Sequence, residues 1–340
     1  MTSIIRVSSP TRVDLAGGTL DLWPLYNFLG GAQTLNLAID IRTHAEILPT
    51  SGEVILESAD LGETKHYPNV AAALADTDPK FLLLRVVLRE IAPDRGFHLK
   101  TKSESPVGGG LGGSSSLMVS MLKAFCLFLE RPLPEPHALA HWAHNVEAEI
   151  LNTPTGTQDY YPAISGGVNL LTFDTKGIRQ EVFPLTGSPF ESKFLLVYTG
   201  RSHHSGLNNF EVLKAAVAKD PKVMEALRNL KTVSTEMVAA LRDRKWDLLA
   251  GLFRREYEAR VRLSPAFTCP EIEELDRVSR AAGAEALKIC GAGGGGCVML
   301  WCPEGRRETI AEACEKAGFK TLNARPVQPL SPPSASGFVS

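Results

Sequence analysis

The sequence predicts an α+β fold. Short apolar segments follow one another at residues 34–41, 45–48 and 53–58, which is typical of a mixed or antiparallel sheet. A helical pattern over residues 80–91 comes only after them, so helices and strands do not simply alternate along the chain. The length of 340 residues is too great for one small core and suits one large or two medium domains.

Composition narrows the classes of function. Hydrophobic residues make up 44% of the chain and charged residues 22%, which is ordinary for a globular protein. The net charge of −2 means that the chain has no excess of positive charge that would attract DNA, RNA or an anionic membrane. No apolar run is long enough to span a membrane, and residues 1–10 lack the apolar core of a signal peptide, so we expect a cytoplasmic protein. The six cysteines form no Cys-x-x-Cys pair, and we expect mostly buried free thiols.

The first glycine-bearing segment follows a predicted strand near the N-terminus. Residues 4–8 and 10–15 predict a strand that leads into the paired glycines at 17–18. One interpretation is a surface turn with a local ion pair. The other is a substrate loop, in which Asp21 accepts hydrogen bonds from sugar hydroxyls and Arg12 carries positive charge toward a reacting centre.

The second segment is the most distinctive stretch of the chain. In residues 105–117 five glycines precede three serines, and the pattern predicts a strand at 96–101 before them and a helix from about Ser114. Strand, glycine loop and helix start form the geometry of an anion site. No lysine follows as a P-loop requires, and the spacing does not fit a dinucleotide fingerprint. Taken alone, the segment is equally consistent with phosphate binding and with a structural turn.

Two carboxylates stand near the end of the next predicted helix. That helix covers residues 137–151 and carries Glu147 one turn before its end, and the irregular loop 153–161 follows it. Asp159 in this loop fits either a helix N-cap or a carboxylate that accepts a proton from a substrate hydroxyl.

The C-terminal half contains the third glycine segment. A buried strand at 194–199 ends at the polar loop 200–206, which fits a ligand loop or a solvated turn. The run of glycines at 291–296 lies between two apolar strands and is longer than an ordinary hairpin needs, which indicates backbone packed closely against another loop or a ligand. The remaining predicted elements are helices at 208–218, 221–242, 245–263, 270–282 and 304–317 and strands at 286–290, 297–302 and 321–325.

These three segments together resemble the GHMP kinase superfamily, named for galactokinase, homoserine kinase, mevalonate kinase and phosphomevalonate kinase. The family's three motifs correspond in order to residues 12–21, 106–114 and 288–296, and the match spans nearly the whole chain. Finer features, including Gln158-Asp159-Tyr160, resemble the sugar-kinase branch related to D-glycero-D-manno-heptose 7-phosphate kinase. Galactokinase has Gly-Glu-His in place of residues 17–19, which weakens a galactose interpretation.

The resemblance implies a two-domain fold. Its N-terminal domain, over residues 1–185, would be ribosomal-protein-S5-domain-2-like and would carry the ATP phosphate loop. Its C-terminal domain, over residues 186–328, would be ferredoxin-like, and residues 329–340 would form a flexible tail. The protein would be a monomer or a homodimer, with a small-molecule substrate and no nucleic-acid or membrane partner.

The implied activity is transfer of the γ-phosphoryl group of ATP, with Mg²⁺, to a sugar or sugar-phosphate hydroxyl, and to the anomeric one in particular. Asp159 would orient the hydroxyl and take its proton, while Arg12 would keep Asp159 ionised and stabilise the transferring group. The family's Mg²⁺ serine falls on Gly113, so its role passes to Ser114, or to Ser115 if the loop shifts by one, together with Glu147. The implied ATP-binding residues are Pro106, Gly108, Gly109, Gly110, Leu111, Gly112, Gly113, Ser114 and Ser115, and the implied substrate-binding residues are Asp21, Gly17, Gly18, Thr19, Arg201, Gly293 and Gly294.

Other functions remain open at this stage. A galactokinase, a fucokinase or a mevalonate-type kinase would use the same chemistry on another alcohol. A catalytically silent sugar- or nucleotide-binding regulator could share the fold, although Arg12, Glu147 and Asp159 are all retained. A nucleotide-dependent dehydrogenase fits least, because neither the glycine spacing nor the strand order suits it.

Overall fold

The larger of two sheets spans the N-terminal half of the chain. The protein is described here by a computed structural model covering residues 4–202 and 205–330. The strands of this sheet are β1 (Ile5–Ala16), β2 (Ala32–Pro49), β3 (Val54–Ser58), β4 (Glu63–Tyr67), β5 (Phe97–Ser103), β6 (Val168–Asp174) and β7 (Gly177–Phe183). Their order is β4-β3-β5-β2-β6-β7, with β1 paired to β2, and only the β3–β5 pair is parallel within the described chain.

The long strand β2 organises this sheet, because it pairs with β1, β5 and β6. The sequence predicts two separate segments at 34–41 and 45–48, whereas the structure has one strand through both. Polar Thr43 interrupts the apolar pattern, but its side chain is buried and meets Ser116 Oγ at 2.8 Å on the helix below. The register between β1 and β2 shifts at Pro10, which has no N–H to donate to the ladder.

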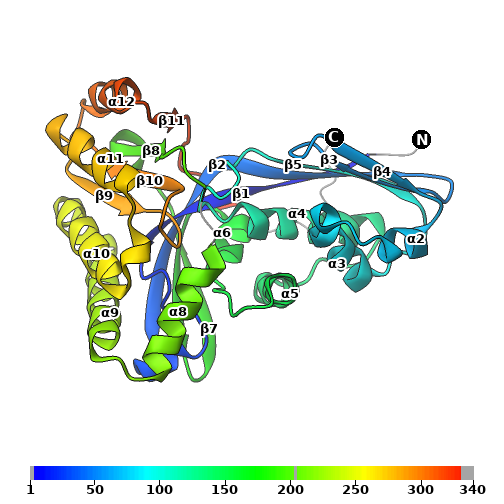
Figure 1. Ribbon diagram of the computed structural model, residues 1–340, viewed down its shortest axis with the longest axis horizontal. Helices are drawn as coiled ribbons and strands as arrows, with labels where there is room; N and C mark the ends of the chain where they lie inside the picture. Colours follow the sequence, from blue (N-terminus) through cyan, green and yellow to red (C-terminus); the bar gives the residue numbers. More distant parts are fainter. Residues whose placement is uncertain (1–3, 203–204, 331–340) are drawn as a thin grey trace.

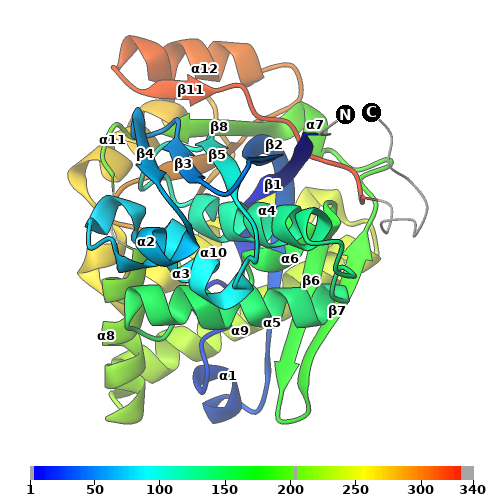
Figure 2. The same ribbon diagram turned by 90° about the vertical axis from the view of Figure 1, so that its right-hand side faces the viewer.

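Helices cover one face of the larger sheet (Figure 1; Figure 2). Helix α4 lies directly on β1 and β2, and α5 packs against its outer side, so most of α4 is buried. Phe97 of the sheet meets Phe125 of α4 edge to face, which is part of the core between the layers. The helical elements of this half are α1 (Leu25–Phe28), α2 (Val70–Ala75), η1 (Pro79–Phe81), α3 (Leu82–Ile91), α4 (Gly113–Phe128), α5 (Pro136–Leu151) and α6 (Tyr160–Ser165).

The smaller sheet belongs to the C-terminal half and is antiparallel, in the order β11-β8-β10-β9. Its strands are β8 (Phe194–Tyr198), β9 (Ala286–Ile289), β10 (Cys297–Trp301) and β11 (Lys320–Leu322). Helices α11 and α12 lie against one face, and α9 and α10 share a core with the other. The helical elements are α7 (Phe190–Lys193), α8 (Ser205–Val217), α9 (Pro221–Arg242), η2 (Trp246–Leu248), α10 (Leu249–Leu263), η3 (Pro265–Phe267), α11 (Pro270–Ala281) and α12 (Arg307–Lys316).

A single apolar cluster joins the two sheets. It contains Leu15 and Leu37 from the larger sheet, Met299 from the smaller sheet and Phe253 from α10, all fully buried. Because burial of this kind is the main stabilising term in folding, the end of β1 is held firmly beside β9 and β10. The first and third glycine segments are therefore neighbours, although they are far apart in the sequence.

The structure confirms the predicted α+β class and places two sheets in the two halves of the chain. The boundary between residues 185 and 186 stays a prediction, and it falls between β7 and α7. Most of the predicted tail, residues 331–340, lies outside the described residues. All six cysteines are free and buried, as expected. Within the described ranges, no helix has the length and apolar character needed to cross a membrane.

Candidate active site

The three glycine segments meet around one cavity of about 370 Å³. Its walls come from the first turn, residues 18–21, from the second glycine loop and the start of α4, and from residues 154–159. The third glycine run contributes Gly291 and Ala292. A cavity where several loops converge with carboxylates and glycine backbone is the default candidate for a ligand site.

The second glycine loop is shaped by left-handed backbone. Gly108, Gly110 and Gly112 have φ angles of +64°, +72° and +69°, which side-chain-bearing residues adopt with strain. The first backbone bond of α4 runs from the Ser116 N–H to the Gly112 carbonyl at 2.9 Å, so the N–H groups of residues 113–115 precede the helical ladder. The loop thus presents a helix N-terminus to the cavity, which favours an anion.

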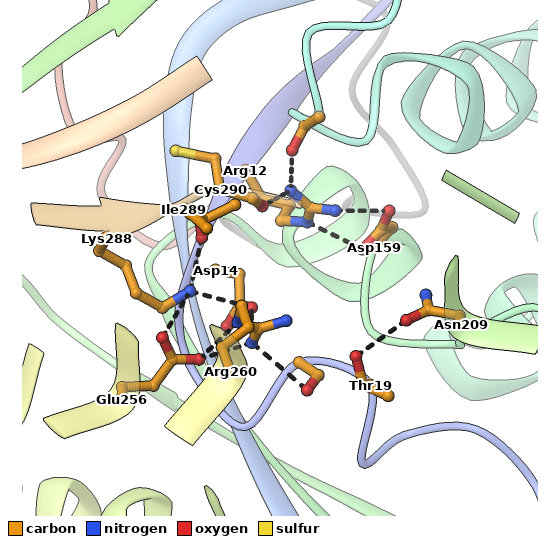
Figure 3. A network of polar contacts seen from close by, with 12 residues as sticks. Arg12, Asp14, Thr19, Asp159, Asn209, Glu256, Arg260, Lys288, Ile289 and Cys290 are labelled. Atoms are coloured by element: carbon orange, nitrogen blue, oxygen red, sulfur yellow. Dashed lines mark hydrogen bonds and ion pairs between the residues drawn. The ribbon is translucent and has the colours of Figure 1, made fainter. Parts of the chain in front are cut away.

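Arg12 and Asp159 form a two-pronged ion pair beside this loop (Figure 3). The Nε–Oδ1 and Nη2–Oδ2 distances are both 2.8 Å. Arg12 Nη1 also donates to the carbonyls of Gly110 and Cys290, each at 2.6 Å. Burial by itself would lower the pKa of Arg12, but the charge and hydrogen bonds of Asp159 outweigh it and the pKa is raised. The Asp159 side chain keeps 22% of its surface exposed, so its carboxylate remains open to the cavity.

Glu147 is the second carboxylate of the cavity, and it contacts a serine. Its Oε2 accepts a hydrogen bond from Ser115 Oγ at 2.7 Å and another from the Tyr160 hydroxyl. Burial and the Glu147 charge raise the pKa of Tyr160 well above its ordinary value, so this hydroxyl remains a donor. Ser114 is exposed at the rim, because α4 begins at Gly113 and its first turn directs Ser115 inward. The structure therefore joins Glu147 with Ser115 and not with Ser114.

The Glu147 carboxylate and the Ser115 hydroxyl together suit a magnesium ion. A carboxylate and a hydroxyl are hard oxygen ligands, and Mg²⁺ is commonly held by one or two carboxylates together with phosphate oxygens and water. No group of three or more histidine, cysteine, aspartate or glutamate side chains could hold a metal ion among the described residues. A metal held by Glu147 and Ser115 would take its remaining ligands from phosphate oxygens and water.

The first glycine turn places Asp21 in the wall of the cavity. Asp21 Oδ2 accepts a hydrogen bond from the Gln158 N–H at 3.0 Å, and the carboxylate is almost fully buried. A Cβ atom on Gly156 would lie 2.1 Å from Asp21 Oδ2, so only glycine fits there. Burial, together with the nearby charges of Asp159 and Asp14, raises the pKa of Asp21 to about 6. Asp21 can therefore change protonation state near neutral pH.

Several residues of the predicted site lie away from this cavity. The Arg201 guanidinium is half exposed and pairs with Glu271 at 3.2 Å, so this geometry gives no support to substrate binding by Arg201. Gly293 packs against the backbone of Phe267, and Gly17 against that of Gln33. Gly294 likewise lies outside the cavity wall. Residues 203–204 of the predicted loop 200–206 are outside the described residues.

The third glycine run supports the second at close range. A Cβ atom on Gly291 would approach the Gly110 Cα to 2.9 Å, and the Cys297 N–H donates to the Gly109 carbonyl at 2.7 Å. The glycine-rich composition of both turns thus follows from backbone that touches backbone. This confirms the close packing against another loop that the sequence predicts for residues 291–296, and that loop is the second glycine loop.

Sequence reasoning did not include Asn209 or Arg260, which line the cavity. Asn209 of α8 accepts a hydrogen bond from Thr19 Oγ1 at 2.8 Å, and Arg260 of α10 bonds to Asp14. The amphipathic spacing of both helices predicts only a structural role, so the sequence does not show that these polar side chains point into the protein. Arg260 lies four residues after Glu256, and from the sequence this spacing predicts an ordinary ion pair on a helix surface.

Comparison with known proteins assigns the family. The model of the GHMP kinase N-terminal domain matches residues 81–167, and the model of the GHMP kinase C-terminal domain matches residues 237–320. This chain belongs to the GHMP kinase family. It is therefore an ATP-dependent phosphotransferase with the GHMP kinase fold, and ATP is its phosphoryl donor.

Individual relatives of this GHMP kinase match over almost their whole length. It is 28% identical to D-glycero-alpha-D-manno-heptose 7-phosphate kinase of Campylobacter jejuni, over 92% of this chain and 93% of that protein. It is 24% identical to mevalonate kinase of Pyrococcus abyssi, over 96% of both chains. The crystal structure of a D-glycero-D-manno-heptose 1-phosphate kinase from Bacteroides thetaiotaomicron superposes with a TM-score of 0.75, at 24% identity over 96% of this chain and 97% of that one.

Proposed function

We propose that this GHMP kinase phosphorylates a hydroxyl of a sugar or sugar phosphate, the anomeric hydroxyl of a heptose 7-phosphate-like substrate in particular. The observation that carries the proposal is the Asp159 carboxylate, which is held by Arg12 directly beside the second glycine loop. The heptose phosphate kinases among its relatives support the sugar class.

Residues 106–115 would bind the triphosphate of ATP. Backbone N–H groups at the start of α4 and the dipole of that helix would face the phosphate oxygens. The cluster of positive φ angles in this loop lets the backbone approach an anion without side-chain interference. Glu147 and Ser115 would hold Mg²⁺, which when bound neutralises charge on the phosphate oxygens.

Asp159 would act on the acceptor hydroxyl. Its carboxylate accepts the hydroxyl proton as the acceptor oxygen forms a bond to the γ-phosphorus, and the bond from that phosphorus to ADP breaks. Arg12 fixes the orientation of the carboxylate through both of its oxygens. Phosphoryl transfer needs little covalent help, so positioning of this pair supplies most of the catalysis.

The acceptor would lie against the first glycine turn. Asp21 would accept hydrogen bonds from sugar hydroxyls, and Gly18 and Thr19 line the same wall. The two cationic side chains in the described wall, Arg12 and Arg260, are both already paired with carboxylates. The described wall therefore offers no unpaired cation to an anionic group of the acceptor, whether a mevalonate carboxylate or a sugar phosphate. Preference for a sugar rests instead on Asp21 and on the heptose phosphate kinases among the relatives.

The experiment is an ADP-release assay with ATP and a panel of acceptors: heptose 7-phosphate, the unphosphorylated heptose, mannose, galactose, fucose and mevalonate. The position of the new phosphate on any product is then located by NMR. We expect phosphorylation of a sugar of the panel, and mevalonate as the sole acceptor would contradict the proposal.

The proposed base is tested with Asp159→Asn. This variant should lower kcat by about 10²–10⁴-fold while ATP affinity stays close to wild type, because removal of a positioned general base typically costs this much. An unchanged kcat would remove Asp159 from the mechanism.

A further inference from the structure

Four charged side chains are buried together at the acceptor wall of the cavity, which two of them line (Figure 3). They are Asp14 of β1, Glu256 and Arg260 of α10, and Lys288 of β9, and none exposes more than 1% of its side chain. We refer to them as the buried charge network. Two carboxylates and two cations balance, so the network carries no formal net charge.

The contacts within the network are short and shared. Arg260 Nη2 lies 2.9 Å from Asp14 Oδ2 and 2.5 Å from Glu256 Oε1. Lys288 Nζ lies 3.3 Å from the same Asp14 oxygen and 3.3 Å from Glu256 Oε2. Each cation thus bridges both carboxylates, and the four side chains tie one strand of the larger sheet to a helix and a strand of the C-terminal half.

Stability alone does not account for such a cluster. Taking charges out of water is costly, and apolar side chains of similar volume often stabilise a buried site as well or better. A buried network is better explained where it fixes one particular geometry. Its remaining hydrogen bonds show which geometry that is.

Both cations reach beyond the network to the backbone of the active site. Arg260 Nη2 donates to the Gly18 carbonyl at 3.3 Å, in the first glycine turn. Lys288 Nζ donates to the Ile289 carbonyl at 2.5 Å, and the next carbonyl, that of Cys290, accepts from Arg12. Lys288 and Arg12 therefore hold two successive carbonyls at the start of the third glycine run.

The network is also linked to Arg12 through β1. Asp14 follows Arg12 by two residues, so both side chains leave the strand on the same face. Anchoring Asp14 from the C-terminal half consequently restrains the position and direction of the Arg12 side chain.

We infer that Arg260 and Lys288 are positioning residues, which hold the first glycine turn and Arg12 at their working distance from Asp159. Arg260 acts on the acceptor side through Gly18, and Lys288 acts on Arg12 through the third glycine run. The inference rests on the proposed function for its kinetic consequences, but the restraint itself can be measured without any acceptor.

The experiment compares Arg260→Lys with the double variant Glu256→Gln/Lys288→Met in the full chain. Arg255→Lys is the matched control, because Arg255 lies on the same helix in a solvent-exposed pair with Glu236. Amide hydrogen exchange with ATP present is followed by mass spectrometry. We expect faster exchange confined to residues 16–22 in Arg260→Lys and to residues 289–296 in the double variant.

Kinetics separate positioning from a merely structural role. With any acceptor identified by the panel, Arg260→Lys should raise the acceptor KM and lower kcat/KM by about 10²-fold, since a misplacement of about 1 Å costs this much. The double variant should lower kcat and leave the acceptor KM unchanged, and the ATP KM should stay at the wild-type value in both.

Uniformly faster exchange over the whole chain, or exchange equal to that of Arg255→Lys, would overturn the inference. If Arg260→Lys does not fold, the double variant decides by the same criteria. If no acceptor of the panel is phosphorylated, the proposed function fails, while hydrogen exchange still tests the positioning role independently.

Discussion

Substitution of Asp21 by asparagine should make this GHMP kinase more stable at neutral pH. Burial raises the pKa of Asp21 from 3.8 to about 6, so the folded protein holds this carboxyl proton more tightly than the unfolded chain does. A raised carboxyl pKa means that ionisation of Asp21 costs stability, and the cost grows as the pH rises from about 4 to about 6. Asparagine carries no such cost at any pH.

The magnitude follows from the size of the shift. A change of roughly two pKa units corresponds to about 3 kcal/mol at pH 7.5, since each unit is worth about 1.36 kcal/mol. At pH 5 only about half of this cost is present, because Asp21 is then mostly protonated in the folded state. The substituted asparagine can keep its amide oxygen toward the Gln158 N–H, so the local hydrogen bond is retained.

The assay is urea unfolding of the wild-type protein and Asp21→Asn at pH 5.0 and pH 7.5. The variant should be more stable by up to about 3 kcal/mol at pH 7.5 and by about 1.5 kcal/mol at pH 5.0. Asp247→Asn, at an exposed position of η2, serves as the control and should show one small difference at both pH values. An Asp21→Asn effect that does not grow with pH, or a less stable variant at pH 7.5, would refute the reasoning.

The same substitution should weaken binding of the acceptor. Loss of a charged hydrogen-bond acceptor costs about 1.5–3 kcal/mol, so kcat/KM for the sugar should fall by about 10–100-fold. In the wild-type protein kcat/KM for the acceptor should decline below about pH 6, as Asp21 becomes protonated. This acid limb should be absent from Asp21→Asn, and its persistence would assign it to another group.

Two further substitutions test the geometry of the cavity. Ser115→Ala should lower kcat by about 10-fold or more and raise the Mg²⁺ concentration needed for half-maximal rate, because Ser115 and not Ser114 meets Glu147. Ser114→Ala is the matched control, and a larger Mg²⁺ effect in that variant would return the role to Ser114. Gly112→Ala should lower kcat at least about 10-fold and stability by about 1–2 kcal/mol, because Gly112 has a φ of +69° and its Cβ would lie 3.2 Å from Asp159 Oδ2. A wild-type kcat with a wild-type melting temperature in Gly112→Ala would show that the loop has room there.

Local signals in the sequence predict much of the fold. The succession of apolar segments predicts an α+β protein, and the structure confirms it with two sheets. Glycine-rich segments predict the turns at 17–18, 108–113 and 291–296, because positive φ angles and close backbone contacts at these turns exclude most other residue types. These features depend on neighbours in the chain and are therefore visible in the sequence.

The sequence did not show which residue at the start of α4 points into the cavity. Residues 114–116 are three consecutive serines, and no local rule says which one turns inward. The choice of Ser115 depends on the point where α4 begins and on the position of Glu147, which lies 32 residues away on another helix. Arg201 is similar, because a partner 70 residues away, Glu271, occupies its guanidinium.

The sequence by itself determined the family, the kinase chemistry and the glycine turns, because those are written in short motifs with local physical requirements. Only the tertiary structure decided which side chains face the cavity and how they are held. Arg12 and Asp159 are 147 residues apart, and Arg260 and Asp14 are 246 residues apart. Arg260 meets Asp14 because one apolar core joins the two halves of the chain, whereas Arg12 meets Asp159 because α6 packs on β1 within the N-terminal half. Contacts between such distant segments produce no periodic pattern in the sequence.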